Sequence, residues 1–127
     1  MNKLGLPDFK STKEADVEIA ITDQENGVHI EVRGRLDMES PALILGEYFR
    51  NMHRTILESN IGHVEVEFSD LKYMNSAAVS FLSSNWIRKV RGLNSYQLIF
   101  IYPKRYYLAL STMALLCQPN AIQKQIA

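Results

Sequence analysis

The fold is decided by one stretch, residues 64–79, which reads VEVEFSDLKYMNSAAV. Its first five residues alternate apolar with acidic side chains, which is the period-two pattern of a half-buried strand. A short polar loop follows. An amphipathic helix is then predicted over residues 76–91, because apolar residues recur at helical spacing until Gly92 ends the pattern. The stretch therefore predicts a strand, a turn and a helix in immediate succession.

Two alternating strands are predicted before this stretch, over residues 17–22 and 28–32. The segment between them contains Asn26-Gly27, a pair that tolerates positive φ and favours tight turns. The two strands are therefore expected to form an antiparallel hairpin.

Helices and strands alternate through the rest of the chain. Ser40-Pro41 predicts a helix start, with serine as N-cap and proline at the first helical position, and the helix should stop before Asn60. A continuous apolar run predicts a strand over residues 98–102, and a third helix is expected over residues 106–117. The order β-β-α-β-α-β-α predicts an α/β domain with a mixed sheet, in which the hairpin is followed by parallel strands.

The alternation also predicts helices mainly on one face of the sheet, since a parallel sheet covered on both faces has uniformly apolar strands. The other face is expected to carry polar side chains, namely Glu18, His29, Glu31, Arg33, Glu65 and Glu67. A solvated face is favoured over a metal or acid/base cluster here. None of the three histidines has a cysteine or a paired carboxylate at ligand spacing along the chain, so no metal site, cofactor or catalytic residue is expected.

Composition narrows the class of protein. The chain has 127 residues with 14 basic and 14 acidic side chains, and zero net charge argues against direct binding to nucleic acid. The single cysteine, Cys117, cannot close an intramolecular disulfide, which favours a reducing compartment. The start lacks a signal-peptide core, and no apolar run is long enough to insert in a membrane. We expect a cytoplasmic protein with one domain over residues 16–127, after a polar lead-in over residues 1–15 for which disorder and packing both stay open.

Two motifs resemble those of the STAS domain, the family of anti-sigma factor antagonists and related signalling modules. Gly34-Arg35-Leu36-Asp37 looks like the family's Gly-x-Leu-Asp turn before the first helix. Residues 68–79 look like the stretch that carries its Asp-Ser-Ser-Gly-Leu-type motif, and the whole resemblance covers about residues 17–117. It implies a non-catalytic module, not an enzyme, that binds an anti-sigma factor or a serine kinase-like regulator.

The resemblance implies that Ser76 is the regulatory phosphoserine. A helix N-terminus suits an added anion, but serine is also a good N-cap, so a purely structural role for Ser76 has equal weight. The sequence departs from the motif at three positions, with Asn75 for the aspartate, Ala77 for the second serine and Ala78 for the glycine. These departures favour an alternative, a non-phosphorylated accessory subunit of an ABC transporter or of a signalling scaffold.

The expected partner-binding surface lies at the start of the second helix. On a helical wheel Phe81 falls opposite the apolar stripe, which predicts an outward-facing aromatic unless another segment covers it. Small residues around one aromatic and one arginine are typical of protein interfaces. A third functional class, a sensor that binds a small molecule, stays open beside the antagonist and the accessory subunit. Self-association into a homodimer also stays open. The predicted surface consists of Asp37, Asn75, Ser76, Ala77, Ser80, Phe81, Ser84 and Arg88.

Overall fold

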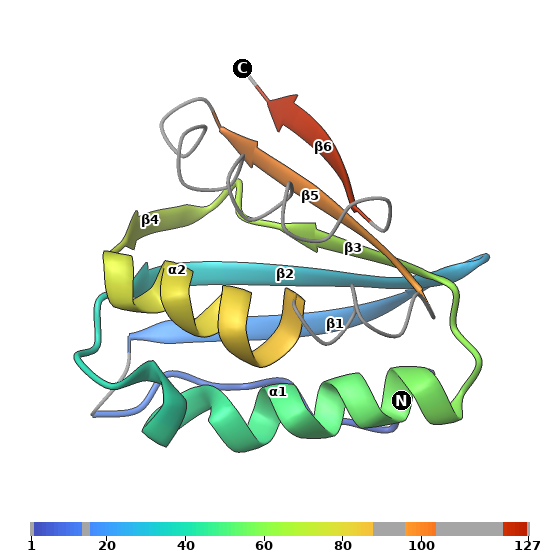
Figure 1. Ribbon diagram of the computed structural model, residues 1–127, viewed down its shortest axis with the longest axis horizontal. Helices are drawn as coiled ribbons and strands as arrows, with labels where there is room; N and C mark the ends of the chain where they lie inside the picture. Colours follow the sequence, from blue (N-terminus) through green and yellow to red (C-terminus); the bar gives the residue numbers. More distant parts are fainter. Residues whose placement is uncertain (1, 14–15, 88–95, 104–120, 127) are drawn as a thin grey trace.

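The computed structural model describes residues 2–13, 16–87, 96–103 and 121–126 (Figure 1). These residues form a mixed α/β domain in which six strands build one sheet and both helices lie against the same face of it. In chain order the elements are β1 (Val17–Gln24), β2 (Gly27–Leu36), α1 (Pro41–Glu58), β3 (His63–Glu67), β4 (Leu71–Met74), α2 (Ser76–Leu82), the π-helical turn η1 (Ser83–Ile87), β5 (Gln97–Pro103) and β6 (Ala121–Ile126).

The sheet has the mixed topology that the sequence predicts. Its strands follow the order β1-β2-β3-β5-β6, and β4 pairs with β2 off this path. Among the pairs of described strands, only β1–β2 is antiparallel, and the others are parallel. The predicted hairpin followed by parallel strands is confirmed.

The connection in the hairpin differs from the expected turn. Gln24 lies opposite Gly27, so the two turn residues are Glu25 and Asn26, and neither they nor Gly27 has positive φ. Gly27 is needed for a different reason. A Cβ at this position would collide with the backbone carbonyl of His63, so the glycine lets β2 approach the start of β3 closely.

The helix α1 begins where Ser40-Pro41 predicts it, although the Ser40 side chain makes no capping hydrogen bond. It ends at Glu58, and Asn60 then adopts a left-handed φ of 54° that takes the chain out of the helix. Its buried side faces the sheet, as the spacing of its apolar residues predicts. The buried apolar residues of this side include Leu45, Phe49, Met52 and Ile56.

Two strands are not predicted by the sequence. The strand β4 occupies part of the expected loop before Ser76, and β6 lies after Pro119, where no strand is expected. Four residues are too few for a clear alternation, which explains why β4 escapes a pattern-based prediction. The expected helix over residues 106–117 and the end of the second predicted helix, residues 88–91, lie outside the described residues.

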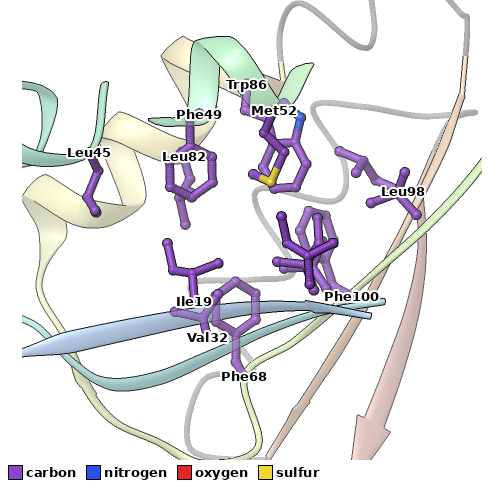
Figure 2. Packing of buried hydrophobic residues seen from close by; sticks show 14 of the residues in the cluster. Ile19, Val32, Leu45, Phe49, Met52, Phe68, Leu82, Trp86, Leu98 and Phe100 are labelled. Carbon is purple, nitrogen blue, oxygen red and sulfur yellow. The ribbon is translucent and has the colours of Figure 1, made fainter. Parts of the chain in front are cut away.

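The core lies between the two helices and the sheet, where side chains from α1, α2 and η1 point toward those of β1, β2 and β5 (Figure 2). Phe49 is central to the helical side, because its ring lies 5.5 Å from Phe81 and 5.4 Å from Trp86. Buried hydrogen bonds of Tyr96, the residue before β5, join it to α1 and η1. The Tyr96 hydroxyl accepts a hydrogen bond from Trp86 Nε1 at 2.7 Å and lies 2.6 Å from His53 Nδ1. Burial raises the pKa of Tyr96, which keeps this hydroxyl protonated.

The described part of the lead-in, residues 2–13, packs against the domain. Phe9 exchanges two backbone hydrogen bonds with Ile19 of β1, at 2.9 and 3.0 Å. Its ring makes an edge contact with Tyr48 of α1 at 5.5 Å, and the Tyr48 hydroxyl donates to the Pro7 carbonyl at 2.9 Å. The lead-in thus joins β1 to α1.

We expect Tyr48→Phe to lower the free energy of unfolding by about 1 kcal/mol at pH 8, because it removes the hydrogen bond to Pro7. Burial, together with the charge of Asp8, raises the pKa of Tyr48 to about 12. The unfolded chain ionises this phenol near pH 10, so its contribution to stability is present below pH 10 and is lost as the pH rises toward 12. Urea unfolding at pH 8 and pH 11 measures both effects.

The stability difference between the native chain and Tyr48→Phe should therefore shrink between pH 8 and pH 11. Tyr73→Phe is the matched control, because the Tyr73 side chain is exposed. A difference that stays constant with pH would contradict the shifted ionisation of Tyr48.

Candidate functional site

The predicted site lies at the edge of the sheet where β2 and β4 end and both helices begin, on the left of Figure 1. Leu36 pairs in register with Met74, the last residue of β4. The residues that follow, Asp37 and Asn75, therefore leave the sheet side by side. The strand β4 thus brings together two motifs that lie almost 40 residues apart in the sequence.

Asn75 connects these two motifs. Its backbone N–H donates to the Leu36 carbonyl at 2.9 Å, and its side-chain Nδ2 donates to the Met38 carbonyl at 3.2 Å. Its Oδ1 accepts a hydrogen bond from the Ala78 N–H at 2.8 Å, which is the geometry of a helix N-cap. Every hydrogen-bonding group of Asn75 thus has a structural role.

The prediction that Ser76 caps the helix is wrong by one residue. Ser76 is the first residue of α2, and the capping bond comes from Asn75. Asparagine and serine are equally good N-caps, so sequence preference does not decide between adjacent residues. The Ser76 side chain is exposed, and it makes no hydrogen bond within the described part of the chain.

The prediction that Phe81 faces outward is also wrong. Phe81 is only 5% exposed, and its ring packs edge-on against Phe49 at 5.5 Å. The reason is that α1 lies beside α2, so α2 is covered by the sheet on one side and by α1 on another. Its buried stripe contains Ala78, Phe81 and Leu82, whereas Val79 is half-buried. Phe81 is a core residue and cannot be a contact of a docked partner in this arrangement.

An exposed aromatic does occur at the site, but it is Tyr73 of β4, which the local sequence pattern does not single out. Tyr73 is 44% exposed and pairs in register with Arg35 of β2. The Arg35 guanidinium lies 5.1 Å from the centre of the Tyr73 ring, and Arg35 Nε donates to Asp37 Oδ2 at 2.9 Å. This hydrogen bond raises the pKa of Arg35. Neither Arg35 nor Tyr73 is unusual in its local sequence pattern. Only the pairing of β4 with β2 brings them together, and the sequence does not predict this pairing.

The other predicted surface residues fall along the outer side of α2 and η1. Ser80 and Ser84 are exposed like Ser76, and Ala77 is half-buried. Arg88 lies outside the described residues. We call the following group the docking surface: Arg35, Asp37, Tyr73, Asn75, Ser76, Ala77, Ser80 and Ser84.

The predicted polar face of the sheet contains a second group of titratable side chains. His29 lies between two carboxylates, with Nδ1 at 3.0 Å from Glu65 Oε1 and Nε2 at 2.9 Å from Glu67 Oε1. Gln24 Nε2 donates to the same Glu65 oxygen at 3.0 Å, and this hydrogen bond, followed by that of His29, lowers the pKa of Glu65.

This arrangement contradicts the expectation that no histidine has carboxylates at ligand spacing. The expectation considered distance along the chain, whereas the parallel register of β2 and β3 places His29 opposite Glu65 and Glu31 opposite Glu67. The six residues predicted for this face are all half-buried. Among them, His29 pairs across strands with Glu65 and Glu67, and Arg33 lies 3.2 Å from Glu31 on its own strand.

No family model matches this chain, and no curated protein matches it. Among solved structures, its fold is similar to that of SiaC of Pseudomonas aeruginosa, with a TM-score of 0.68 and 13% sequence identity. The match covers 95% of this chain and 100% of that chain. The likeness supports the α/β fold of a small STAS-like domain that the sequence predicts. Across the described residues, none of the helices has the length and apolar character that crossing a membrane requires.

We expect Asn75→Ala to lower the free energy of unfolding by about 1 kcal/mol or more, because it removes the N-cap of α2 and the bond to Met38. Ser76→Ala should change it by less than about 0.5 kcal/mol, because this side chain is exposed and does not cap the helix. Urea unfolding of the two variants makes the comparison. A larger loss of stability in Ser76→Ala than in Asn75→Ala would show that Ser76 is the N-cap.

Proposed function

We propose that this protein is a non-catalytic signalling module that acts by binding a partner protein in the cytoplasm, in the manner of an anti-sigma factor antagonist. The partner is an anti-sigma factor or a serine kinase-like regulator. The observation that carries the proposal is the exposed Ser76 at the start of α2, on a surface shared with Tyr73 and Arg35. The STAS-like motifs and the fold similarity to SiaC support it.

The chemistry of the docking surface suits a protein partner. Tyr and Arg are enriched among the residues that contribute most to binding at interfaces. Here the Arg35 guanidinium is held between the Tyr73 ring and the Asp37 carboxylate, so it is oriented before a partner arrives. Such pre-organisation reduces the conformational entropy that is lost on binding. The small side chains of Ser76 and Ser80 allow a partner to approach the helix backbone.

Phosphorylation of Ser76 is the proposed switch. It would add a charge of about −1.5 to −2 and three acceptor oxygens to the docking surface. The first turn of α2 contains no acidic residue, and the helix is already capped by Asn75, so the added charge need not unfold the helix. The charge would instead repel acidic groups of the partner and raise the desolvation cost of docking, so the partner is released.

We expect Ser76→Asp to weaken binding to the partner at least tenfold, because the carboxylate imitates part of the phosphate charge. Ser76→Ala should bind within about twofold of the native chain, since it removes only a small exposed hydroxyl. Isothermal titration calorimetry with the purified partner measures both affinities. Equal affinities of the two variants would refute the switch while leaving the binding surface intact.

A second pair of variants tests the surface itself. We expect Tyr73→Ala and Arg35→Ala each to weaken binding about tenfold or more, as is typical of aromatic and arginine anchors. Arg54→Ala is the matched control, because Arg54 is an exposed arginine in the second half of α1 and pairs only weakly with Glu58 at 3.9 Å. If Arg54→Ala weakens binding as much as Arg35→Ala, the docking surface is misplaced.

One observation favours the accessory-subunit alternative. Asn75 donates its Nδ2 to the Met38 carbonyl, and a carboxylate at this position, as in the family motif, could not donate this bond. The position therefore has a structural role here that is independent of phosphorylation. Mass spectrometry of the protein from its native cell separates the two functions, since a regulated module should contain some phospho-Ser76. A pulldown that recovers a transporter ATPase in place of a kinase-like regulator would favour the accessory subunit.

A further inference from the structure

Three potential metal ligands converge on the polar face of the sheet, away from the docking surface. Ligand atoms of His29, Glu31 and Glu67 all lie within 4.8 Å of one another. Glu31 and Glu67 are directly opposite each other on the adjacent parallel strands β2 and β3, and His29 precedes Glu31 by two residues on the same face. All three side chains are half-buried.

The histidine is oriented as a metal-binding histidine would be. Its Nδ1 lies 3.0 Å from Glu65 Oε1, and Gln24 holds that oxygen through a second hydrogen bond. Histidine ligands of metal ions commonly donate their other ring N–H to a carboxylate, which fixes the tautomer and turns the free nitrogen to the metal. Here Glu65 is the carboxylate that accepts from His29 Nδ1. Nε2 is then the free nitrogen, and it points toward Glu67.

The distance from His29 Nε2 to Glu67 Oε1 is close to the distance between two ligands of one cation. When Nδ1 carries the proton, the Nε2 lone pair and Glu67 Oε1 lie 2.9 Å apart and repel each other. Either a second proton or a metal ion between the two atoms removes this repulsion. Two ligands of a tetrahedral Zn²⁺ with bonds of about 2.1 Å are about 3.4 Å apart, so a widening of about 0.5 Å would admit the ion beside these two atoms.

Charge also favours a cation at this point. Carboxylates directly opposite each other on adjacent strands destabilise a sheet unless a cation compensates them. The Arg33 guanidinium compensates part of this charge, since its Nε lies 3.2 Å from Glu31 Oε1. Arg33 thus compensates the charge of Glu31, whereas Glu67 contacts His29 Nε2 at 2.9 Å. A second positive charge among His29, Glu31 and Glu67 would therefore relieve the remaining repulsion.

We propose that His29, Glu31 and Glu67 bind a divalent transition-metal ion, with Zn²⁺ the best match, and that Glu65 is the positioning residue for His29. One imidazole and two carboxylates form a mixed nitrogen and oxygen ligand set that suits Zn²⁺, whereas Mg²⁺ and Ca²⁺ prefer oxygen ligands alone. Water would complete the coordination, since the three side chains are half-buried and not enclosed. The ion would cross-link β2 to β3.

The test is a titration of the metal-free full chain with ZnCl₂, monitored by isothermal titration calorimetry. We expect saturable binding of one Zn²⁺ ion in the micromolar range, and at least tenfold weaker binding of Mg²⁺. Glu67→Gln, which keeps the size of the side chain, and His29→Ala should each weaken Zn²⁺ binding at least tenfold. Glu65→Gln should weaken it less, because it changes only the orientation of His29.

Two control variants separate this site from other zinc ligands. Glu18→Gln changes a carboxylate of the same polar face that pairs across β1 and β2 with Arg33, and it should leave the affinity unchanged. Cys117→Ser removes the single thiol and should also leave it unchanged. Circular dichroism confirms that each variant is folded. A change in the ¹⁵N chemical shift of His29 Nε2 on adding Zn²⁺ gives an independent readout. Binding that survives His29→Ala, or no saturable binding below 1 mM, would overturn the proposal.

Discussion

The pairing of β2 with two successive parallel neighbours determines most of this structure. The first part of β2 pairs with β3, and its end pairs with β4, with a register shift between Gly34 and Arg35. Gly34 makes the shift feasible. Its φ of 95° disfavours other residues, and a Cβ there would collide with the Asp16 carbonyl, which accepts a hydrogen bond from the Arg35 N–H at 2.7 Å.

The proposed metal ligands and the docking surface both depend on this one strand. In its first part, the register with β3 places His29 and Glu31 opposite carboxylates and so assembles the proposed metal ligands. After the shift, the register with β4 places Arg35 opposite Tyr73 and brings the two STAS-like motifs together. The two groups lie at different positions along β2, so a variant in one group can be studied without changing the contacts of the other.

Periodicity predicts the elements that have enough residues to show it. The hairpin, α1 and β3 are predicted because their alternation or helical spacing extends over at least five residues, and β5 is predicted from a continuous apolar run. The strand β4 has four residues and forms through pairing with β2, which local sequence does not encode. His29 and Glu65 are 36 residues apart, so their contact depends on a register that no spacing rule gives. The wheel for Phe81 assumed a single buried side, but α1 covers a second side of α2.

The N-cap of α2 and the proposed phosphorylation site are two adjacent residues. Asn75 uses its N–H, its Oδ1 and its Nδ2 to cap α2 and to hold the loop that contains Leu36 and Met38. Ser76 contributes none of these bonds and is exposed. If Ser76 were the cap, a phosphate on its hydroxyl would remove the capping bond and destabilise α2 at the same time as it changed the surface. With Asn75 as the cap, a charge at Ser76 can alter docking while the helix beneath it stays folded, which is what a reversible switch requires.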